Sequence, residues 1–148
     1  MGGRPGGFGA NQLEVQCADG LGKMHADLTR LSPAGINSEL QSTVDVIQAA
    51  SGQRPKCFRP PYGATNTTVI FEAARLGLTQ VLWNVDPSDY TRPGAATIAA
   101  RVLAAANGSG LVVGMHDGGG DRSQTIAALP AIIAGLAARG YNFVRLCT

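Results

Sequence analysis

Four polar side chains in this sequence each follow a short apolar run, at the kind of position where a buried strand ends. They are Arg59, Asp86, Asp89 and His116. A histidine can give or take a proton near neutral pH, a carboxylate can orient such a histidine, and an arginine can hold an anion through its planar guanidinium. These residue types are suited to acid–base chemistry if the fold brings them together.

The elements that would position these residues follow a regular order along the chain. Ser32 followed by Pro33 is a typical helix start, and the apolar residues from Ile36 to Ile47 line one helical face until Gly52. Similar patterns predict the remaining elements, which are helices over about 66–77, 95–106 and 123–139 and strands over about 57–59, 78–85, 110–115 and 141–146.

This alternation of strands and helices with short connections predicts an α/β fold with a parallel sheet or barrel. Folds of this kind carry their chemistry at the carboxyl ends of the strands. The four polar residues all stand at such ends, so we expect them to converge on one rim. This coincidence is the main functional signal in the residues themselves.

The bulk composition favours one globular domain. The chain has 148 residues, of which 45% are hydrophobic and 15% are charged, and its formal net charge is +2. So small a charge argues against nucleic acid as the main partner. No apolar run reaches the roughly 18 residues that a membrane span needs, and no secretory signal is visible.

The cysteines and the first 24 residues stand apart from these patterns. Cys17, Cys57 and Cys147 are odd in number and widely spaced, so we predict buried free thiols rather than a disulfide framework or a cysteine-based zinc site. Glycines interrupt any helical or strand-like spacing of apolar residues in residues 1–24, where only Leu13–Cys17 could form a short strand.

Three motifs occur in the order and spacing of a known family. They are Arg59-Pro60-Pro61-Tyr62-Gly63, Asp86-Pro87-Ser88-Asp89-Tyr90 and Met115-His116-Asp117. Over about Gly22–Thr148 the chain resembles the polysaccharide deacetylases, also called NodB-homology domains or carbohydrate esterase family four. The resemblance implies a distorted (β/α) barrel, here incomplete, with residues 1–24 as a divergent segment and 25–148 as the C-terminal part of the domain.

The resemblance also implies a reaction, which is the metal-dependent hydrolysis of N- or O-acetyl groups on a polysaccharide. His116 would be the general acid that protonates the leaving group, and Asp89 would orient it. Arg59 would hold the catalytic carboxylate. Asp86 is equally well explained as the cap of its own turn.

Other motif positions would contact the substrate. Tyr62 and Tyr90 would form walls of the groove. The family has a leucine two residues before the histidine, where it forms the pocket for the acetate methyl group, and this chain has Gly114 there. Met115 or Val113 could fill that space.

The metal site of the family is incomplete in this sequence. His25 resembles the second histidine of a His-(Ser/Thr)-x-x-His motif, but Leu21 stands in place of the first. The family's pair of adjacent aspartates is absent, and Asp19 is better explained by an Asp-Gly turn. Catalytic zinc typically has three protein ligands, so we expect zinc, or another divalent ion, to be held weakly.

Three functions remain open at this point. The first is a deacetylase, with impaired activity in this chain, that acts on peptidoglycan, chitin or xylan. The second is a non-catalytic carbohydrate-binding remnant of the same fold, and the third is an unrelated α/β domain. A substrate of the first kind implies a secreted or cell-envelope location. Without the first strand of the barrel, open sheet edges would favour a homo-oligomer, or residues 1–24 could fold back through Leu13–Cys17 as a substitute strand.

Overall fold

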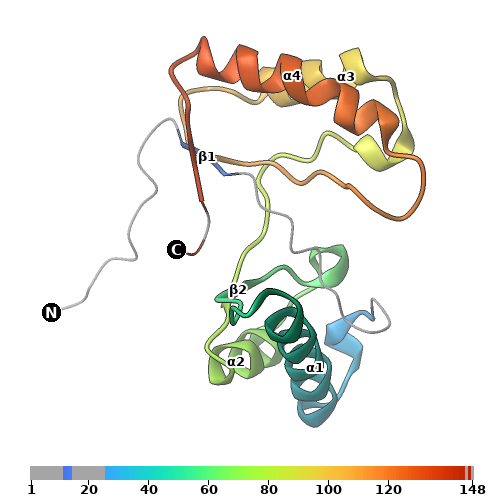
Figure 1. Cartoon of the computed structure of the whole chain (residues 1–148), viewed down its shortest axis with the longest axis vertical. Coiled ribbons are helices and arrows are strands. Elements are labelled where there is room, and N and C mark those ends of the chain that lie inside the picture. Colours follow the sequence, from blue (N-terminus) through green and yellow to red (C-terminus); the bar gives the residue numbers. More distant parts are fainter. Residues whose placement is uncertain (1–11, 15–25, 146, 148) are drawn as a thin grey trace, which may run out of the picture. The chain divides into compact units, whose positions relative to one another are not determined.

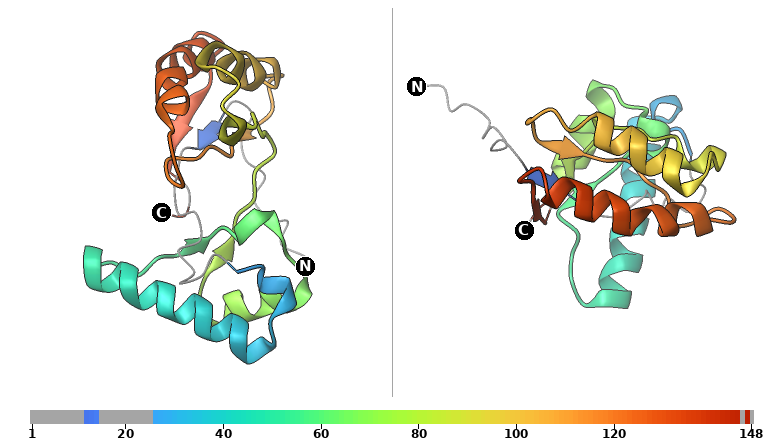
Figure 2. Two further views of the ribbon diagram at one scale, coloured as in Figure 1. Left: turned by 90° about the vertical axis from the view of Figure 1, so that its right-hand side faces the viewer. Right: turned by 90° about the horizontal axis from the view of Figure 1, so that it is seen from above.

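The computed structural model describes residues 12–14, 26–145 and 147, and the chain divides into two compact units (Figures 1 and 2). Unit 1 consists of Met1–Cys17 and Trp83–Arg145. Unit 2 consists of Ala18–Leu82 and Leu146–Thr148. Each unit has its own hydrophobic core and its own parallel strand pairing.

Unit 1 contains a three-stranded parallel sheet in the order β4-β1-β5. The central strand β1 (Gln12–Glu14) pairs with β4 (Leu111–Val112) on one side and with β5 (Asn142–Val144) on the other. The prediction of a short strand near Leu13 is therefore confirmed, although the described strand ends at Glu14. Its pairing matches the expectation that the N-terminal segment folds back as a strand.

Two helices of unit 1 pack against each other along their length, α3 (Ala95–Ala104) and α4 (Ser123–Ala137) (Figure 1). Their close approach depends on Gly135, because a Cβ atom at this position would lie 2.7 Å from Cδ2 of Leu103. The apolar faces of both helices bury the core together with strand residues. This core contains Val85, Ile98, Ala99, Val102, Leu111, Ala128, Ile132, Leu136 and Tyr141.

Unit 2 contains α1 (Pro33–Ser51) and α2 (Thr67–Arg75), with the short parallel pair β2 (Cys57–Phe58) and β3 (Thr79–Gln80). Ser32 caps α1 by accepting a hydrogen bond from the N–H of Gly35, and the helix ends at Gly52 with a left-handed φ of 72°. Asn66 caps α2 by accepting from the N–H of Val69. These helices confirm the sequence predictions.

The strand predicted over 78–85 is wrong as a single element. Its first part is β3 in unit 2, whereas Val85 forms an isolated parallel bridge with Val113 in unit 1. The side chain of Asn84 replaces part of the backbone ladder, since its Oδ1 accepts from the N–H of Val112 at 2.8 Å and its Nδ2 donates to the carbonyl of Gly110 at 2.9 Å. The amide thus acts as a strand partner.

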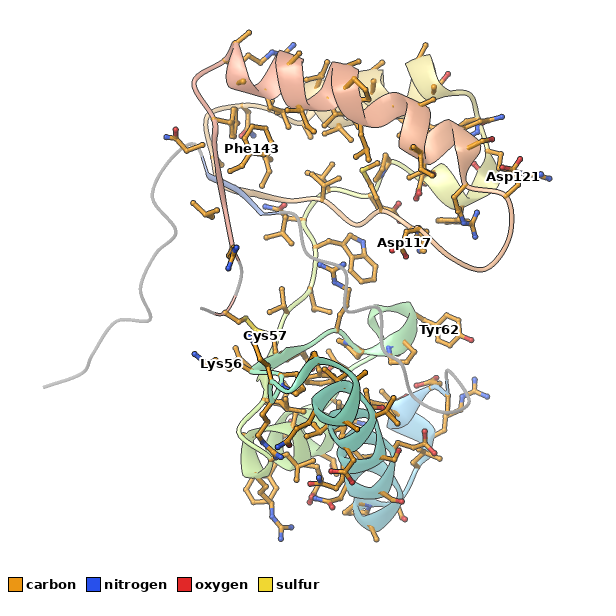
Figure 3. The ribbon with its side chains drawn as sticks, viewed as in Figure 1. Lys56, Cys57, Tyr62, Asp117, Asp121 and Phe143 are labelled. Atoms are coloured by element: carbon orange, nitrogen blue, oxygen red, sulfur yellow. A yellow bond between two sulfur atoms is a disulfide. The ribbon has the colours of Figure 1, made fainter. Side chains whose placement is uncertain are left out.

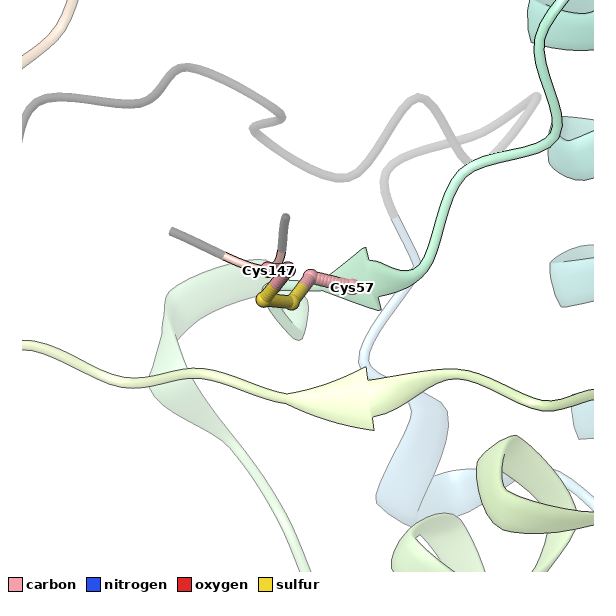
Figure 4. Close-up of a disulfide and its surroundings, with 2 residues drawn as sticks. All are labelled: Cys57 and Cys147. Atoms are coloured by element: carbon pink, nitrogen blue, oxygen red, sulfur yellow. A yellow bond between two sulfur atoms is a disulfide. The ribbon is translucent and has the colours of Figure 1, made fainter. Parts of the chain in front are cut away.

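The prediction of free thiols is wrong for two of the three cysteines. Cys57 and Cys147 form a disulfide within unit 2, at a Cα–Cα distance of 6.1 Å (Figure 4). That distance lies in the usual range for disulfides. The two residues are 90 positions apart, so no local pattern could reveal the pair. Cys17 lies outside the described residues.

Candidate acid–base site in unit 1

A histidine and a buried aspartate form the centre of the candidate site. His116 follows β4, and its Nδ1 lies 2.8 Å from Oδ1 of Asp89. The backbone N–H of His116 also donates to Oδ2 of the same carboxylate at 2.9 Å. An ionised carboxylate can only accept, so Nδ1 carries the proton of this bond. The outer nitrogen Nε2 is then the atom that can exchange a proton with a ligand.

The side chains of Asp89 and His116 differ in their exposure to solvent. The side chain of Asp89 is completely buried, whereas that of His116 is 41% exposed. Burial alone would raise the pKa of Asp89, because a buried carboxylate loses its hydration. Hydrogen bonds from His116 and from Thr125 outweigh this effect and hold the pKa of Asp89 below its ordinary value. Asp89 is therefore a fixed negative charge beneath an accessible imidazole.

Thr125 is a site residue that the sequence analysis missed. It lies in the first turns of α4 and is buried, and its hydroxyl donates to Oδ2 of Asp89 at 2.8 Å. With the N–H of His116 on the same oxygen, this bond leaves Oδ1 directed at the imidazole. A threonine inside a helix carries no sequence signal of such a role, because only the fold brings it to Asp89.

The loop that carries Asp89 has a specialised backbone. Asp89 begins the 3-10 turn η3 (Asp89–Thr91), and the residues on either side, Ser88 and Arg92, have left-handed φ values of 53° and 55°. Non-glycine residues adopt this region rarely. Asp86 accepts from the N–H of Ser88 at 2.7 Å. This hydrogen bond is the turn-capping contact that the sequence suggested for Asp86 as an alternative to a role in the site.

Tyr90 contacts the imidazole, and Arg122 connects the loops on which Tyr90 and His116 lie. The ring of Tyr90 meets that of His116 edge-on, with centroids 5.4 Å apart. Arg122 donates to the carbonyls of Gly118 and Gly119, at 2.8 and 3.3 Å, and to that of Tyr90 at 3.5 Å. One guanidinium therefore connects the loop after His116 with the turn that carries Tyr90. Figure 3 shows Asp117 and Asp121 on the same loop before α4.

The segment from Leu111 to His116 alternates between two faces. Leu111 belongs to the core beneath α3 and α4, and Val113 and Met115 pack against that core. In contrast, the N–H groups of Val112, Gly114 and His116 all donate to acceptors in the segment 84–89. An extended chain has this pattern, in which every second residue shares a direction.

This alternation bears on the predicted substrate-binding residues. Met115 and Val113 point to the core, on the face opposite to His116. This placement gives no support to a role for Met115 beside a bound acyl group. Tyr90, in contrast, is half exposed and lies next to the imidazole.

Two further predicted site residues belong to unit 2. Arg59 is partly buried at the end of β2, and Tyr62 lies in the 3-10 turn η2 (Pro61–Gly63) with a left-handed φ of 60°. The Tyr62 side chain is 71% exposed and projects outward from its turn (Figure 3). The structure thus brings together Asp89, Tyr90 and His116, and the convergence of Arg59 and Tyr62 on them stays a prediction.

The described residues do not supply a metal-binding set. Among residues 26–145 and 147 there is no cluster of three or more histidine, cysteine, aspartate or glutamate side chains with the arrangement to hold an ion. His25, the predicted ligand, lies outside the described residues. In the same part of the chain, none of the helices combines the length and apolar character needed to cross a bilayer.

Comparisons with known proteins agree on one family. The profile of the polysaccharide deacetylase family matches residues 22–81. A chitooligosaccharide deacetylase of Bradyrhizobium sp. (strain ANU 289) is 38% identical over 130 residues, which cover 80% of this chain and 59% of that protein. A peptidoglycan-N-acetylglucosamine deacetylase of Bacillus cereus is 45% identical over 94 residues, which cover 62% of this chain and 44% of that protein.

Solved structures of the same family share the fold. A family 4 carbohydrate esterase from Streptomyces lividans, in complex with acetate, superposes with a TM-score of 0.71 at 39% identity, covering 79% of this chain and 58% of that one. A CE4 family pseudoenzyme from Bacillus anthracis gives a TM-score of 0.76 at 30% identity, covering 82% and 42%. The predicted fold class, an α/β fold of the polysaccharide-deacetylase type present in part, is confirmed.

The chain thus spans between about two fifths and three fifths of the lengths of these four proteins. Sequence and structure lead to the same conclusion, and two of the three motifs, at 86–90 and 115–117, lie beyond the residues 22–81 that the profile matches. The chain belongs to the polysaccharide deacetylases, the NodB-homology domains of carbohydrate esterase family four.

Proposed function

We propose that this chain is part of a hydrolase that removes acetyl groups from a polysaccharide, with His116 as the general acid. The observation that carries the proposal is the pair formed by Asp89 and His116. A buried, ionised carboxylate holds Nδ1 of a partly exposed imidazole, which leaves Nε2 directed away from the carboxylate. Such a pair presents Nε2 as the atom that can donate a proton to a ligand.

The proposed reaction requires one proton at the leaving atom. Water adds its oxygen to the acetyl carbon and releases one proton to solvent. The C–N or C–O bond to the sugar breaks, the leaving nitrogen or oxygen takes a proton from Nε2 of His116, and the ring regains a proton from solvent. Asp89 stabilises the positive charge that the ring carries before this step. Thr125 and the N–H of His116 fix the carboxylate during the transfer. General acid catalysis of this kind contributes about 10²- to 10⁴-fold to rates.

The substrate class follows from the relatives and from the exposed aromatic residues. The relatives include enzymes named for chitooligosaccharide, for peptidoglycan and, in Cellvibrio japonicus, for xylan. All three are carbohydrates that can carry acetyl groups. The exposed rings of Tyr90 and Tyr62 are suited to contact the apolar faces of sugars. We assign both tyrosines to substrate binding and Arg59 to an anionic partner.

Family membership is consistent with a divalent metal cofactor. We propose zinc, with His25 as one ligand, although the described residues offer no ligand set that completes the site. A single histidine is a weak anchor for this ion. Elemental analysis of the purified chain after dialysis is expected to give less than one zinc per chain, and His25→Ala should lower that content further. Stoichiometric zinc that His25→Ala leaves unchanged contradicts this part.

The disulfide supports a location outside the reducing cytosol. Structural disulfides persist in oxidising compartments such as the cell exterior, and Cys57 and Cys147 form one. Acetylated polysaccharides of the cell envelope, or of the medium around the cell, are also found outside the cytosol. We also propose that residues 25–148 are the deacetylase part of the chain and that residues 1–24 are a divergent segment that supplies β1.

A second function is a non-catalytic carbohydrate-binding module. The observation in its favour is the CE4 family pseudoenzyme of Bacillus anthracis, which superposes at least as well as the esterase from Streptomyces lividans. The fold therefore persists in a relative described as a pseudoenzyme. In this alternative, Tyr90 and His116 would bind sugar without turning it over.

Acetate release separates the two functions. The chain is incubated with an acetylated chito-oligosaccharide and zinc, and free acetate is measured for the wild type, for His116→Ala and for Ser109→Ala. Ser109 is exposed before the same strand, so its variant is a matched control. The hydrolase proposal expects release that His116→Ala reduces about 10²-fold or more and that Ser109→Ala retains. Saturable binding with no release in the wild type supports the module instead.

A further inference from the structure

The turn between α3 and β4 contains the one asparagine of this chain that is followed by glycine. This pair is Asn107-Gly108, and the other asparagines of the sequence precede larger residues. Asn107, Gly108 and Ser109 are all exposed and lie outside the helices and strands. Gly108 has a left-handed φ of 90°, and a Cβ atom there would meet nothing within 4 Å. The backbone nitrogen of Gly108 is therefore sterically unhindered.

An asparagine that precedes an unhindered backbone nitrogen can lose its side-chain amide without an enzyme. The nitrogen of the next residue gives up its proton and bonds to Cγ, the bond from Cγ to Nδ2 breaks, and ammonia leaves with a proton. The product is a cyclic succinimide, which one water molecule then opens to aspartate or isoaspartate. Asparagine belongs to the thermolabile residues for this reason.

One hydrogen bond within the turn favours the attack on Asn107. Its side-chain Oδ1 accepts from the N–H of Ser109 at 3.1 Å. This bond folds the side chain of Asn107 back over the turn that contains the nitrogen of Gly108. The N–H of Ser109 is also placed to stabilise the negative charge that develops on Oδ1 when the nitrogen adds to Cγ.

A second hydrogen bond restrains the nitrogen that would attack. The N–H of Gly108 donates to the hydroxyl of Tyr141 at 2.9 Å. Tyr141 is only 4% exposed and belongs to the core of unit 1, so its hydroxyl is held in place. A neutral phenol is too weak a base to remove the proton. The proton that must leave Gly108 is therefore engaged by a group that protects it.

We infer that Asn107 is a site of spontaneous deamidation and that the hydroxyl of Tyr141 sets the rate of this reaction. The reaction requires a local opening in which the N–H of Gly108 leaves that hydroxyl. The site is separate from the acid–base pair, because the turn precedes β4 whereas His116 follows it. Conversion to aspartate adds a negative charge to the turn, and isoaspartate also inserts a methylene group into the main chain before β4.

Ageing of the purified full chain at mildly alkaline pH tests this inference. Mass spectrometry of the intact chain and of its peptides measures the conversion of amide to acid and locates it. The variants are Asn107→Gln, Tyr141→Phe and Ile132→Val. Glutamine would have to close a larger ring, so Asn107→Gln should remove the conversion at this position. Ile132→Val is the matched control for Tyr141→Phe, because it loosens the same core and keeps the hydroxyl.

The expected rates differ among these chains. The wild type should convert slowly at Asn107, and Tyr141→Phe should convert about fivefold faster, the factor that corresponds to one net hydrogen bond. Ile132→Val should keep the wild-type rate. Hydrogen exchange of the wild-type Gly108 amide, followed by NMR, decides the matter if Tyr141→Phe fails to fold. This amide should exchange at least about tenfold more slowly in the folded chain than in the urea-unfolded chain.

Three results overturn the inference. The first is a rate in Tyr141→Phe that equals that of the wild type, and the second is an equal acceleration in Tyr141→Phe and Ile132→Val. The third is conversion at other asparagines while Asn107 stays intact in the wild type and in Tyr141→Phe. For a Tyr141→Phe chain that does not fold, an unprotected Gly108 amide in the wild type has the same force.

Discussion

The hydroxyl of Thr125, in α4, donates a hydrogen bond to the buried carboxylate of Asp89 at 2.8 Å. The helix thereby takes part in the acid–base site, although no atom of Thr125 contacts the imidazole in the described hydrogen bonds. Two donors on Oδ2, the threonine hydroxyl and the N–H of His116, hold the carboxylate so that Oδ1 remains for the ring. Thr125 is accordingly a positioning residue.

Thr125→Val should weaken both stability and turnover. Valine has the shape of threonine but no hydroxyl, so a buried carboxylate loses one donor, at a cost of about 1–3 kcal/mol in the free energy of unfolding. Urea unfolding and acetate release are the measurements. Thr125→Ser keeps the hydroxyl and should restore most of the turnover. Equal turnover in Thr125→Val and the wild type would remove the positioning role.

Asp89 should make stability depend on acidity. Hydrogen bonds hold the pKa of Asp89 below its ordinary value in the folded chain. Its contribution to the free energy of unfolding is therefore present above the unfolded pKa of about 3.9 and is lost as the pH falls through the lower folded pKa. Asp89→Asn should be less stable than the wild type at pH 7, and the difference should narrow below about pH 4.

Urea unfolding at a series of pH values from 7 downward checks this dependence. Asp121→Asn is the control. The N–H of Ser123 donates a hydrogen bond to the exposed carboxylate of Asp121 and lowers the pKa of Asp121 as well. Because solvent screens that carboxylate, the control should show a smaller pH-dependent difference. A stability difference for Asp89→Asn that stays constant over the whole pH range contradicts the assigned ionisation.

The disulfide should contribute substantially to the stability of unit 2. A cross-link between residues 90 positions apart restricts the unfolded chain strongly, and bonds of this kind typically contribute about 2–4 kcal/mol. Reduction with dithiothreitol should lower the thermal unfolding midpoint of the wild type. Cys57→Ser should show the lower midpoint without reductant and no further decrease with it. Cys17→Ser, as a control, should retain the response to dithiothreitol.

The cap of α1 is a separate test of local structure. The side chain of Ser32 accepts a hydrogen bond from the N–H of Gly35 at 3.2 Å. Replacement of Ser32 by alanine should lower the free energy of unfolding by about 1 kcal/mol. Ser38 is exposed within the same helix, where alanine is a better helix former. Ser38→Ala should therefore leave the free energy of unfolding unchanged or raise it slightly. Equal losses in both variants, measured by urea unfolding, would contradict the capping role.

Local signals made the helices predictable. The strands depend on pairing with distant parts of the chain, which the sequence does not reveal. Ser32, Asn66 and Gly52 act within one helical turn, so the sequence indicates where α1 and α2 begin or end. The division of the segment 78–85 depends on which strands lie beside it. The side chain of Asn84 takes the place of a backbone partner there, and no periodicity reveals such a substitution.

The same distinction applies to the site. Asp89 and His116 stand at strand ends, where a parallel fold places its chemistry, and the structure joins them by hydrogen bonds. Thr125 lies in a helix and acquires its contact with Asp89 only through tertiary packing. The direction of Met115 follows from alternation along its strand, which a motif comparison alone does not consider.

The position of β1 also has a consequence for the order in which the chain acquires its structure. The central strand of the unit 1 sheet pairs Gln12 with Asn142 and Leu13 with Phe143. As the ribosome makes this chain, the early strand emerges long before its late neighbour exists. Pairings between residues so distant in sequence form slowly, because the loop between them must first be closed. The edge of β1 that β5 later covers is therefore a surface that a chaperone would meet during synthesis.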